Sequence, residues 1–103
     1  MALTSKQRSQ LRGLAAAEDT IIQVGKSGIT DNLVESVLAA LKARELVKGK
    51  VLESCELTPR EVCDELSERC RAEQVQVIGT KFVLYKRNEK EPKIVLVKDK
   101  KKA

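Results

Sequence analysis

The stretch Gly25-Lys26-Ser27-Gly28 most constrains what this chain can fold into. It follows an apolar run at residues 21–24 and precedes a helix start at residues 29–33. Glycines permit tight turns, and the N–H groups of such a turn, together with a helix N-terminus, favour an anion. This stretch, the glycine loop, therefore predicts a turn from strand to helix that either holds a phosphate or binds nothing.

Two nucleotide-binding motifs are excluded at the glycine loop. Gly25-Lys26-Ser27 looks like the end of a Walker A motif, but that motif requires a glycine at position 20, where the chain has Thr20. A dinucleotide-binding fingerprint requires three glycines, of which only two are present. Phosphate contact at this loop would therefore not depend on a nucleotide-binding domain.

The composition of the chain argues against catalysis and metal binding. Its 103 residues fit one domain, and the 42% of hydrophobic residues suffice for one core. The chain has no histidine, which removes the most common general base and the most common metal ligand. We therefore expect no enzyme activity, no cofactor and no metal.

The three cysteines are Cys55, Cys63 and Cys70, and none of them forms a Cys-x-x-Cys pair that would indicate a zinc site. An odd number of cysteines without a signal peptide is typical of free thiols in a reducing compartment, so we expect a cytoplasmic location. Cys63 and Cys70 are expected as small core residues. No apolar run approaches the ~20 residues of a membrane span.

Charge is distributed unevenly along the chain. Residues 53–73 contain seven acidic residues and three arginines, a net charge of −4, which leaves +9 for the rest of a chain whose net charge is +5. A basic face with an acidic back is typical of a nucleic-acid-binding protein. The alternative is ordinary solubilising charge, which the composition alone leaves open.

Hydrophobic periodicity predicts an α/β fold with the order helix, strand, helix, strand, helix, strand, strand. The predicted elements span residues 5–17, 20–24, 30–43, 46–52, 59–71, 74–78 and 81–86. Thr4 with Gln7 and Thr58 with Glu61 have the spacing of capping boxes. Such a chain should form a small two-layer domain with helices on a mixed four-stranded sheet, and the strand order stays open.

Three local features qualify this prediction. Gly49 weakens the second strand and indicates a bulge there. Residues 94–97 could add an edge strand after a polar break. Residues 98–103 form a lysine-rich tail that we expect to be disordered, which leaves residues 1–97 as the folded domain.

Several segments, in this order, resemble the CRM domain, named for chloroplast RNA splicing and ribosome maturation. They are residues 22–30, 43–48, 75–79 and 83–85, and the resemblance extends over about residues 3–87. The similarity is greatest to the stand-alone bacterial YhbY-like proteins. At Gly49 the chain departs from the family, where a β-branched residue is more usual.

The resemblance implies a fold like the C-terminal domain of translation initiation factor 3 and an RNA-binding function. Bacterial members of the family associate with precursors of the large ribosomal subunit, and plant relatives use repeated copies in intron splicing. The glycine loop is the family's RNA-contacting element, which here corresponds to Gly25, Lys26, Ser27 and Gly28. We therefore expect a monomer whose partner is the rRNA precursor in a pre-ribosomal particle.

Further candidate contacts come from basic residues on predicted helices. Arg8 and Arg12 lie one turn apart on the first helix, and Lys42 and Arg44 lie at the end of the second. The chain has only two aromatic residues, so RNA binding should depend on phosphates, sugars and shape more than on stacked bases. The alternative function is a protein-interaction adaptor on the ribosome that docks through the acidic third helix.

Overall fold

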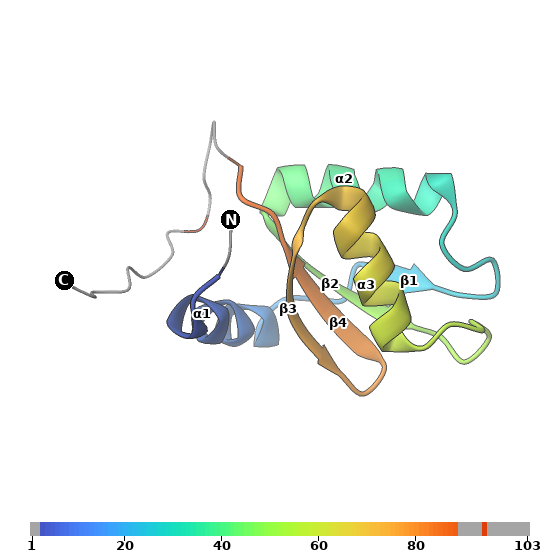
Figure 1. Ribbon diagram of the computed structural model, residues 1–103, viewed down its shortest axis with the longest axis horizontal. Coiled ribbons are helices and arrows are strands. Elements are labelled where there is room, and N and C mark those ends of the chain that lie inside the picture. Colours follow the sequence, from blue (N-terminus) through green and yellow to red (C-terminus); the bar gives the residue numbers. More distant parts are fainter. Residues whose placement is uncertain (1–2, 89–93, 95–103) are drawn as a thin grey trace.

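Three helices and four strands make up the computed structural model, which describes residues 3–88 and residue 94 (Figure 1). The order predicted from the sequence is confirmed, with each boundary within two residues of its prediction. In chain order the elements are α1 (Ser5–Ala16), β1 (Ile22–Val24), α2 (Asp31–Arg44), β2 (Leu46–Val51), α3 (Pro59–Cys70), β3 (Glu73–Ile78) and β4 (Lys81–Tyr85).

Each helix begins at a threonine whose side chain satisfies an N–H of the first turn. The Thr4 and Thr58 hydroxyls accept from the N–H groups of Gln7 and Glu61, both at 3.1 Å. The Gln7 and Glu61 side chains accept in return from the cap N–H groups, so both predicted capping boxes are confirmed. These caps fix where α1 and α3 start, and therefore how the helices enter the core.

The sheet has the strand order β1-β2-β4-β3. β1 and β2 are parallel, whereas β4 is antiparallel to both β2 and β3. The mixed four-stranded sheet predicted from the sequence is confirmed. Since β4 lies between β2 and β3, residues from the end of the chain meet residues from its middle.

The bulge predicted at Gly49 is wrong. Gly49 pairs in register with Ile22 on one side and Phe82 on the other, and the register shift occurs instead in β3, between Gln74 and Gln76. The Phe82 ring lies directly over Gly49: a Cβ built there would meet Phe82 Cζ and lie 2.8 Å from Cε1 and Cε2. The glycine therefore makes room for the ring.

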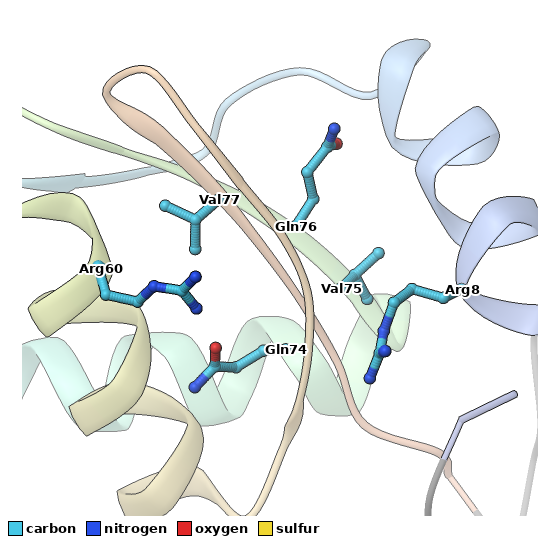
Figure 2. Close-up of a pocket in the computed structure, with 6 residues that line it drawn as sticks. All are labelled: Arg8, Arg60, Gln74, Val75, Gln76 and Val77. Atoms are coloured by element: carbon cyan, nitrogen blue, oxygen red, sulfur yellow. The ribbon is translucent and has the colours of Figure 1, made fainter. Parts of the chain in front are cut away.

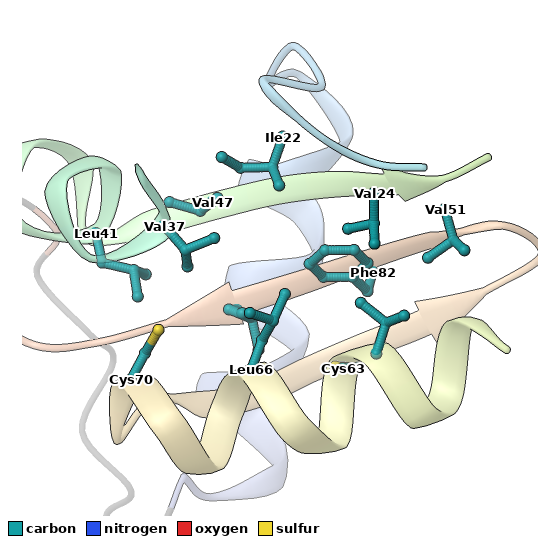
Figure 3. Close-up of a cluster of buried hydrophobic side chains, with 12 residues drawn as sticks. Ile22, Val24, Val37, Leu41, Val47, Val51, Cys63, Leu66, Cys70 and Phe82 are labelled. Atoms are coloured by element: carbon teal, nitrogen blue, oxygen red, sulfur yellow. The ribbon is translucent and has the colours of Figure 1, made fainter. Parts of the chain in front are cut away.

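Helices lie on both faces of the sheet. One buried cluster lies between the sheet and helices α2 and α3, and Phe82 is at its centre (Figure 3). A second cluster lies under α1 on the opposite face and includes Leu11, Val83 and Tyr85. The predicted two-layer arrangement holds for α2, α3 and the sheet, and α1 adds a helix on the other face. Because Phe82 and Tyr85 are both buried, neither ring offers a stacking surface.

Glu45, at the junction of α2 and β2, fixes the chain that follows β4. Its side chain is fully buried, and its carboxylate accepts from the N–H groups of Asn88 at 2.6 Å and Ile94 at 2.7 Å. Its own carbonyl accepts from the Lys86 N–H at 2.9 Å. Ile94 lies in a bend, and the rest of the strand predicted at 94–97 and the tail at 98–103 lie outside the described residues.

Candidate nucleic-acid interface

The glycine loop is a hydrogen-bonded turn with its two polar side chains at the tip. The Gly28 N–H donates to the Gly25 carbonyl at 2.9 Å, which leaves Lys26 and Ser27 as the central, exposed residues. Neither side chain makes a hydrogen bond or ion pair to any residue in the described part of the chain. Both are therefore free to meet a ligand.

The two glycines have different roles in the loop. Gly28 has φ +67°, a conformation that other residues adopt only with strain. Gly25 lies close to the loop after β2, since a Cβ there would be 3.5 Å from Leu52 Cδ1 and Ser54 Oγ. Gly28 is thus required by backbone geometry, whereas a Cβ at Gly25 would make only ordinary van der Waals contacts with the loop after β2.

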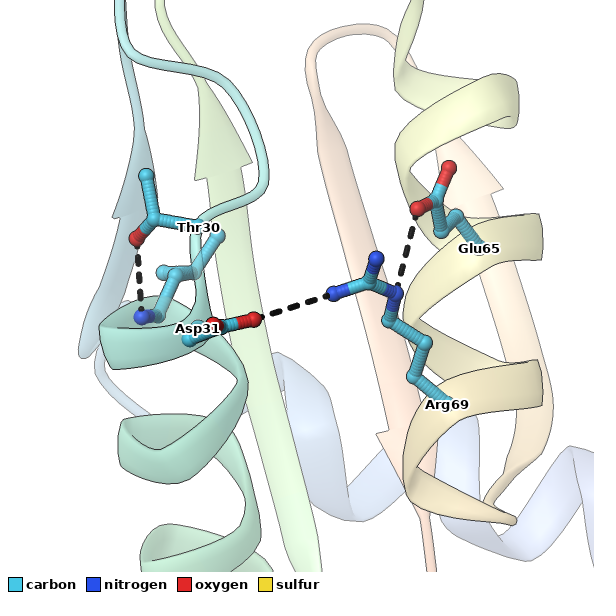
Figure 4. A network of polar contacts seen from close by, with 5 residues as sticks. Thr30, Asp31, Glu65 and Arg69 are labelled. Atoms are coloured by element: carbon cyan, nitrogen blue, oxygen red, sulfur yellow. Dashed lines mark hydrogen bonds and ion pairs between the residues drawn. The ribbon is translucent and has the colours of Figure 1, made fainter.

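The N-terminus of α2 follows the loop directly but is partly occupied by the protein's own groups. The Thr30 hydroxyl accepts from the Leu33 N–H at 3.1 Å. Asp31, in the first turn, lies 3.8 Å from Arg69 Nη1, and Arg69 Nε lies 3.2 Å from Glu65 (Figure 4). An acidic residue in the first turn already complements the helix dipole. The start of α2 is therefore already partly satisfied by the protein's own groups, whereas the tip of the glycine loop is not.

Arg8 lies far from the loop along the sheet edge formed by β3. It is half-buried and lines a groove of about 330 Å³ together with Arg60 of α3 (Figure 2). The remaining lining residues are Gln74, Val75, Gln76 and Val77 of β3. Arg12 is exposed on α1. The sequence pattern did not single out Arg60, because its approach to Arg8 depends on the placement of β3 between α1 and α3.

Lys42 and Arg44 lie at the opposite end of α2 from the glycine loop. The helix has 14 residues, so its two ends are ~20 Å apart. Both side chains are exposed, and Arg44 Nη1 lies 3.6 Å from Glu18 Oε1. The structure therefore distributes the predicted contacts over three places, the loop, the β3 edge and the end of α2, and does not gather them into one site.

Comparison with known proteins identifies the family. A profile of the CRS1/YhbY (CRM) domain matches residues 3–86. This chain belongs to the CRM domain family. YqeI of Bacillus subtilis, named as a probable RNA-binding protein, is 42% identical over 94 residues, which cover 91% of this chain and 98% of YqeI. An RNA-binding protein of Haemophilus influenzae is 34% identical over 94 residues, which cover 91% and 94% of the two chains.

The fold of the CRM domain is shared with a protein of known structure. The solution structure of a hypothetical Staphylococcus aureus protein, described there as a candidate RNA-binding protein, superposes with a TM-score of 0.78 at 40% identity. The match covers 93% of this chain and all of the other. The family inferred from the resemblance is thus confirmed, and so is the small α/β domain with a mixed four-stranded sheet.

Lysines on the sheet of this CRM domain were also not singled out from the sequence. Lys48, Lys50 and Lys81 lie on β2 and β4, on the sheet face that carries α1. The available signal was the alternation of Lys48 and Lys50 around Gly49, which predicts one shared face. The neighbourhood of Lys81 depends on strand order, which the sequence left open.

The cysteines of the CRM domain are free, and two of them are buried. Burial, with a smaller effect of Asp64, raises the pKa of the Cys63 thiol from 9.0 to about 11, and burial also raises the pKa of Cys70. Neither has the low pKa of a reactive thiol. Within residues 3–88 and 94 there is no group of residues suited to hold a metal ion, and no helix there is long and apolar enough to cross a membrane.

Proposed function

We propose that this CRM domain binds RNA through the glycine loop and acts in assembly of the large ribosomal subunit. The observation that carries the proposal is the exposed loop tip, where the Lys26 and Ser27 side chains make no hydrogen bond or ion pair with other described residues. Relatives named as RNA-binding proteins support RNA as the partner. The ribosomal role and the rRNA precursor as partner rest on the family resemblance alone.

Contacts to phosphates, and not to stacked bases, would provide the binding energy. Lys26 supplies a cation, Ser27 a hydroxyl, and the turn a short run of N–H groups. Arg8 and Arg12 on α1, and Lys42 and Arg44 at the end of α2, would meet other parts of a large RNA. The protein acts as a cytoplasmic monomer, with residues 1–97 as the binding domain and residues 98–103 as a tail that adds non-specific attraction.

The loop is tested by replacing Lys26 and Ser27 with aspartate in one variant. The two acids would lie where a phosphate should bind, so RNA affinity should fall by more than about tenfold, since charge-assisted hydrogen bonds contribute about 1.5–3 kcal/mol each. The melting temperature should not fall, because both side chains are exposed and acids near the start of α2 favour its dipole. Affinity is measured by fluorescence anisotropy with a labelled RNA hairpin.

A control variant is available with the same residue types and the same change in charge. Ser5 and Lys6 are exposed in the first turn of α1, so Ser5→Asp with Lys6→Asp changes the net charge equally and also places acids near a helix start. The control should reduce affinity less than the loop variant does, and if the loop variant binds RNA as well as the parent, the glycine loop is only a turn. The binding surface would then have to be sought at Arg8, Arg12, Lys42 and Arg44.

Gly28→Val provides a contrast to the loop variant. Because Gly28 has φ +67°, valine should be strained there, at a cost on the order of 1–3 kcal/mol. Melting temperature and RNA affinity should therefore both fall, whereas the double aspartate variant loses affinity alone.

The acidic face of α3 favours a second candidate, an adaptor for a basic ribosomal protein. Asp64, Glu65 and Glu68 are exposed on this helix. Two of these acids already have partners: Asp64 Oδ1 accepts from Gln74 Nε2 at 2.6 Å, and Glu65 pairs with Arg69. Co-sedimentation with ribosomal particles after nuclease treatment separates the two functions, because an adaptor stays with protein and an RNA binder is released.

A further inference from the structure

A row of side chains crosses the whole sheet at the end where the glycine loop lies. In register, Gln23 of β1 pairs with Lys50 of β2, and Lys50 pairs with Lys81 of β4. Lys81 in turn pairs with Ile78 of β3. We call Gln23, Lys50 and Lys81 the lysine row. The strand order brings these residues together from positions up to 58 apart in the chain.

The lysine row lies on an uncovered part of the face that carries α1. Its neighbours one residue along, Ile22, Gly49 and Phe82, face the opposite side, where the first cluster lies. On the α1 face, the second cluster contains residues from the far end of the same strands, Leu46 and Tyr85. At the row itself, Gln23 and Lys81 are exposed and Lys50 is half-buried. The helix therefore leaves this end of the face open.

The two lysines of the row face each other without a counter-ion. Lys50 and Lys81 are directly paired across antiparallel strands, and neither makes an ion pair within the described part of the chain. Like charges directly opposite each other on a sheet are destabilising. The third lysine of this face, Lys48, is held by the Ala15 carbonyl at 3.3 Å. The row is thus an open, doubly positive site whose charge does not serve folding.

The row is continuous with the glycine loop. Gln23 lies on β1, two residues before Gly25, and Lys50 lies on the parallel strand β2, two residues before Leu52. The Leu52 N–H donates to the Val24 carbonyl at 2.8 Å, which joins the two strand ends. The glycine loop and the lysine row therefore adjoin at the same end of the sheet, through the joined ends of β1 and β2.

From this continuity we infer that the lysine row binds phosphates of the same RNA that the glycine loop contacts. The inference rests on the proposed function and adds to it a path for the RNA strand: from the loop tip onto the open sheet face, over β2 and β4. A nucleic-acid backbone suits the row because it presents successive anionic groups, and a directly opposed pair of lysines can neutralise them. Gln23 adds an amide beside the two cations.

The informative variant is Lys81→Glu, for which RNA affinity should fall without any loss of stability. The new carboxylate faces Lys50 and replaces a repulsive pair by an attractive one, so the melting temperature should stay equal to the parent's or rise. Affinity for a fluorescein-labelled RNA hairpin with a single-stranded extension should fall by at least about tenfold. The log–log salt slope should become shallower by ~0.7–0.9 for each phosphate that the variant no longer neutralises.

Lys6→Glu provides the control, since it makes the same reversal of charge at an exposed position of α1 away from the row. It should reduce affinity far less than Lys81→Glu. A second variant, Lys50→Gln with Lys81→Gln, removes the two cations without adding an acid. This double variant should also weaken RNA binding, and it tests the row independently in case the new carboxylate of Lys81→Glu disturbs β4.

The outcomes separate this inference from the proposed function. If the parent binds the hairpin and the loop variant loses binding while both row variants retain it, the inference about the lysine row is wrong and the proposed role of the glycine loop is supported. If the parent shows no salt-dependent RNA binding, the proposed function is wrong, and so is the inference that the lysine row binds RNA. If polyglutamate competes with the hairpin as well as unlabelled RNA does, the row is a site for an acidic protein and the inference is overturned.

Discussion

Replacing Gly49 with alanine should destabilise this domain, although alanine and β-branched residues normally suit a strand better than glycine. The added Cβ would meet Phe82 Cζ and lie 2.8 Å from Cε1 and Cε2. Phe82 is completely buried among side chains of α2, α3 and the sheet, so its ring cannot move without displacing them. The substitution therefore overpacks the centre of the first cluster.

Two opposing effects determine how much stability the Gly49→Ala variant loses. Overpacking a core typically costs 1–3 kcal/mol, and a clash with a ring so fully enclosed should lie in the upper part, at roughly 2–3 kcal/mol. Removing a glycine from the unfolded chain contributes roughly 0.4–1 kcal/mol in the other direction. The net loss should be about 1–2 kcal/mol, which corresponds to a fall in melting temperature of about 5–15 °C for a domain of this size.

Urea unfolding followed by far-ultraviolet circular dichroism measures this loss, and Gly13→Ala is the matched control. Gly13 lies inside α1, and a Cβ there would meet nothing within 4 Å, so alanine should stabilise by roughly 0.5–1 kcal/mol. In a Phe82→Leu background the cost of Gly49→Ala should shrink, with a coupling of about 1 kcal/mol or more. A neutral or stabilising Gly49→Ala, or the same cost in both backgrounds, would refute the role given to the ring.

The remaining predictions concern the chain after β4 and the thiols. Glu45→Gln should lower the free energy of unfolding by about 1–3 kcal/mol, because one of the two N–H groups that now donate to the carboxylate would face an NH₂ donor. Unchanged urea unfolding would contradict this. Deleting residues 98–103 should weaken RNA binding modestly and leave the melting temperature unchanged, and a large thermal shift would show that the tail is packed. In the native protein iodoacetamide should modify half-buried Cys55 before Cys63 and Cys70, as peptide mass mapping would detect. Because the pKa of Cys63 is raised from 9.0 to about 11, its contribution to stability should be complete below pH 9 and be lost as the pH rises toward 11, by ~1.4 kcal/mol per pH unit at most. Cys63→Ala should show a smaller alkaline loss in urea unfolding, although the raised pKa of Tyr85 adds its own loss above pH 10.

Local signals in the sequence predicted the elements well because their causes are local. Thr4 and Thr58 cap helices through residues three positions ahead, and Gly28 adopts its positive φ within a single turn. By contrast, the role of Gly49 depends on Phe82, a residue 33 positions away on a strand whose neighbours the sequence did not specify. A glycine in a strand is ambiguous until the side chain opposite it is known.

The residues of the candidate site also divide into those that local sequence predicts and those that depend on tertiary packing. The exposed tip of the glycine loop followed from its two glycines and the helix behind it. The separation of Lys42 and Arg44 from the loop follows from the length of α2, which the sequence did predict, so the sequence alone already implied it. The pairing of Lys50 with Lys81 required β4 to lie beside β2, a consequence of tertiary packing and not of any local pattern.

The second cluster also determines how copies of this domain can be joined. Leu3, before α1, and Ile94, after β4, both belong to or pack against that cluster, and Glu45 binds the Ile94 N–H beside the start of β2. The glycine loop lies near the other end of β2, ~15–20 Å away for a strand of six residues. A short linker between successive copies would therefore keep every loop free at its outer end. Once one copy is bound, the next would search for RNA at a high effective concentration, so avidity would grow with copy number without any new contact.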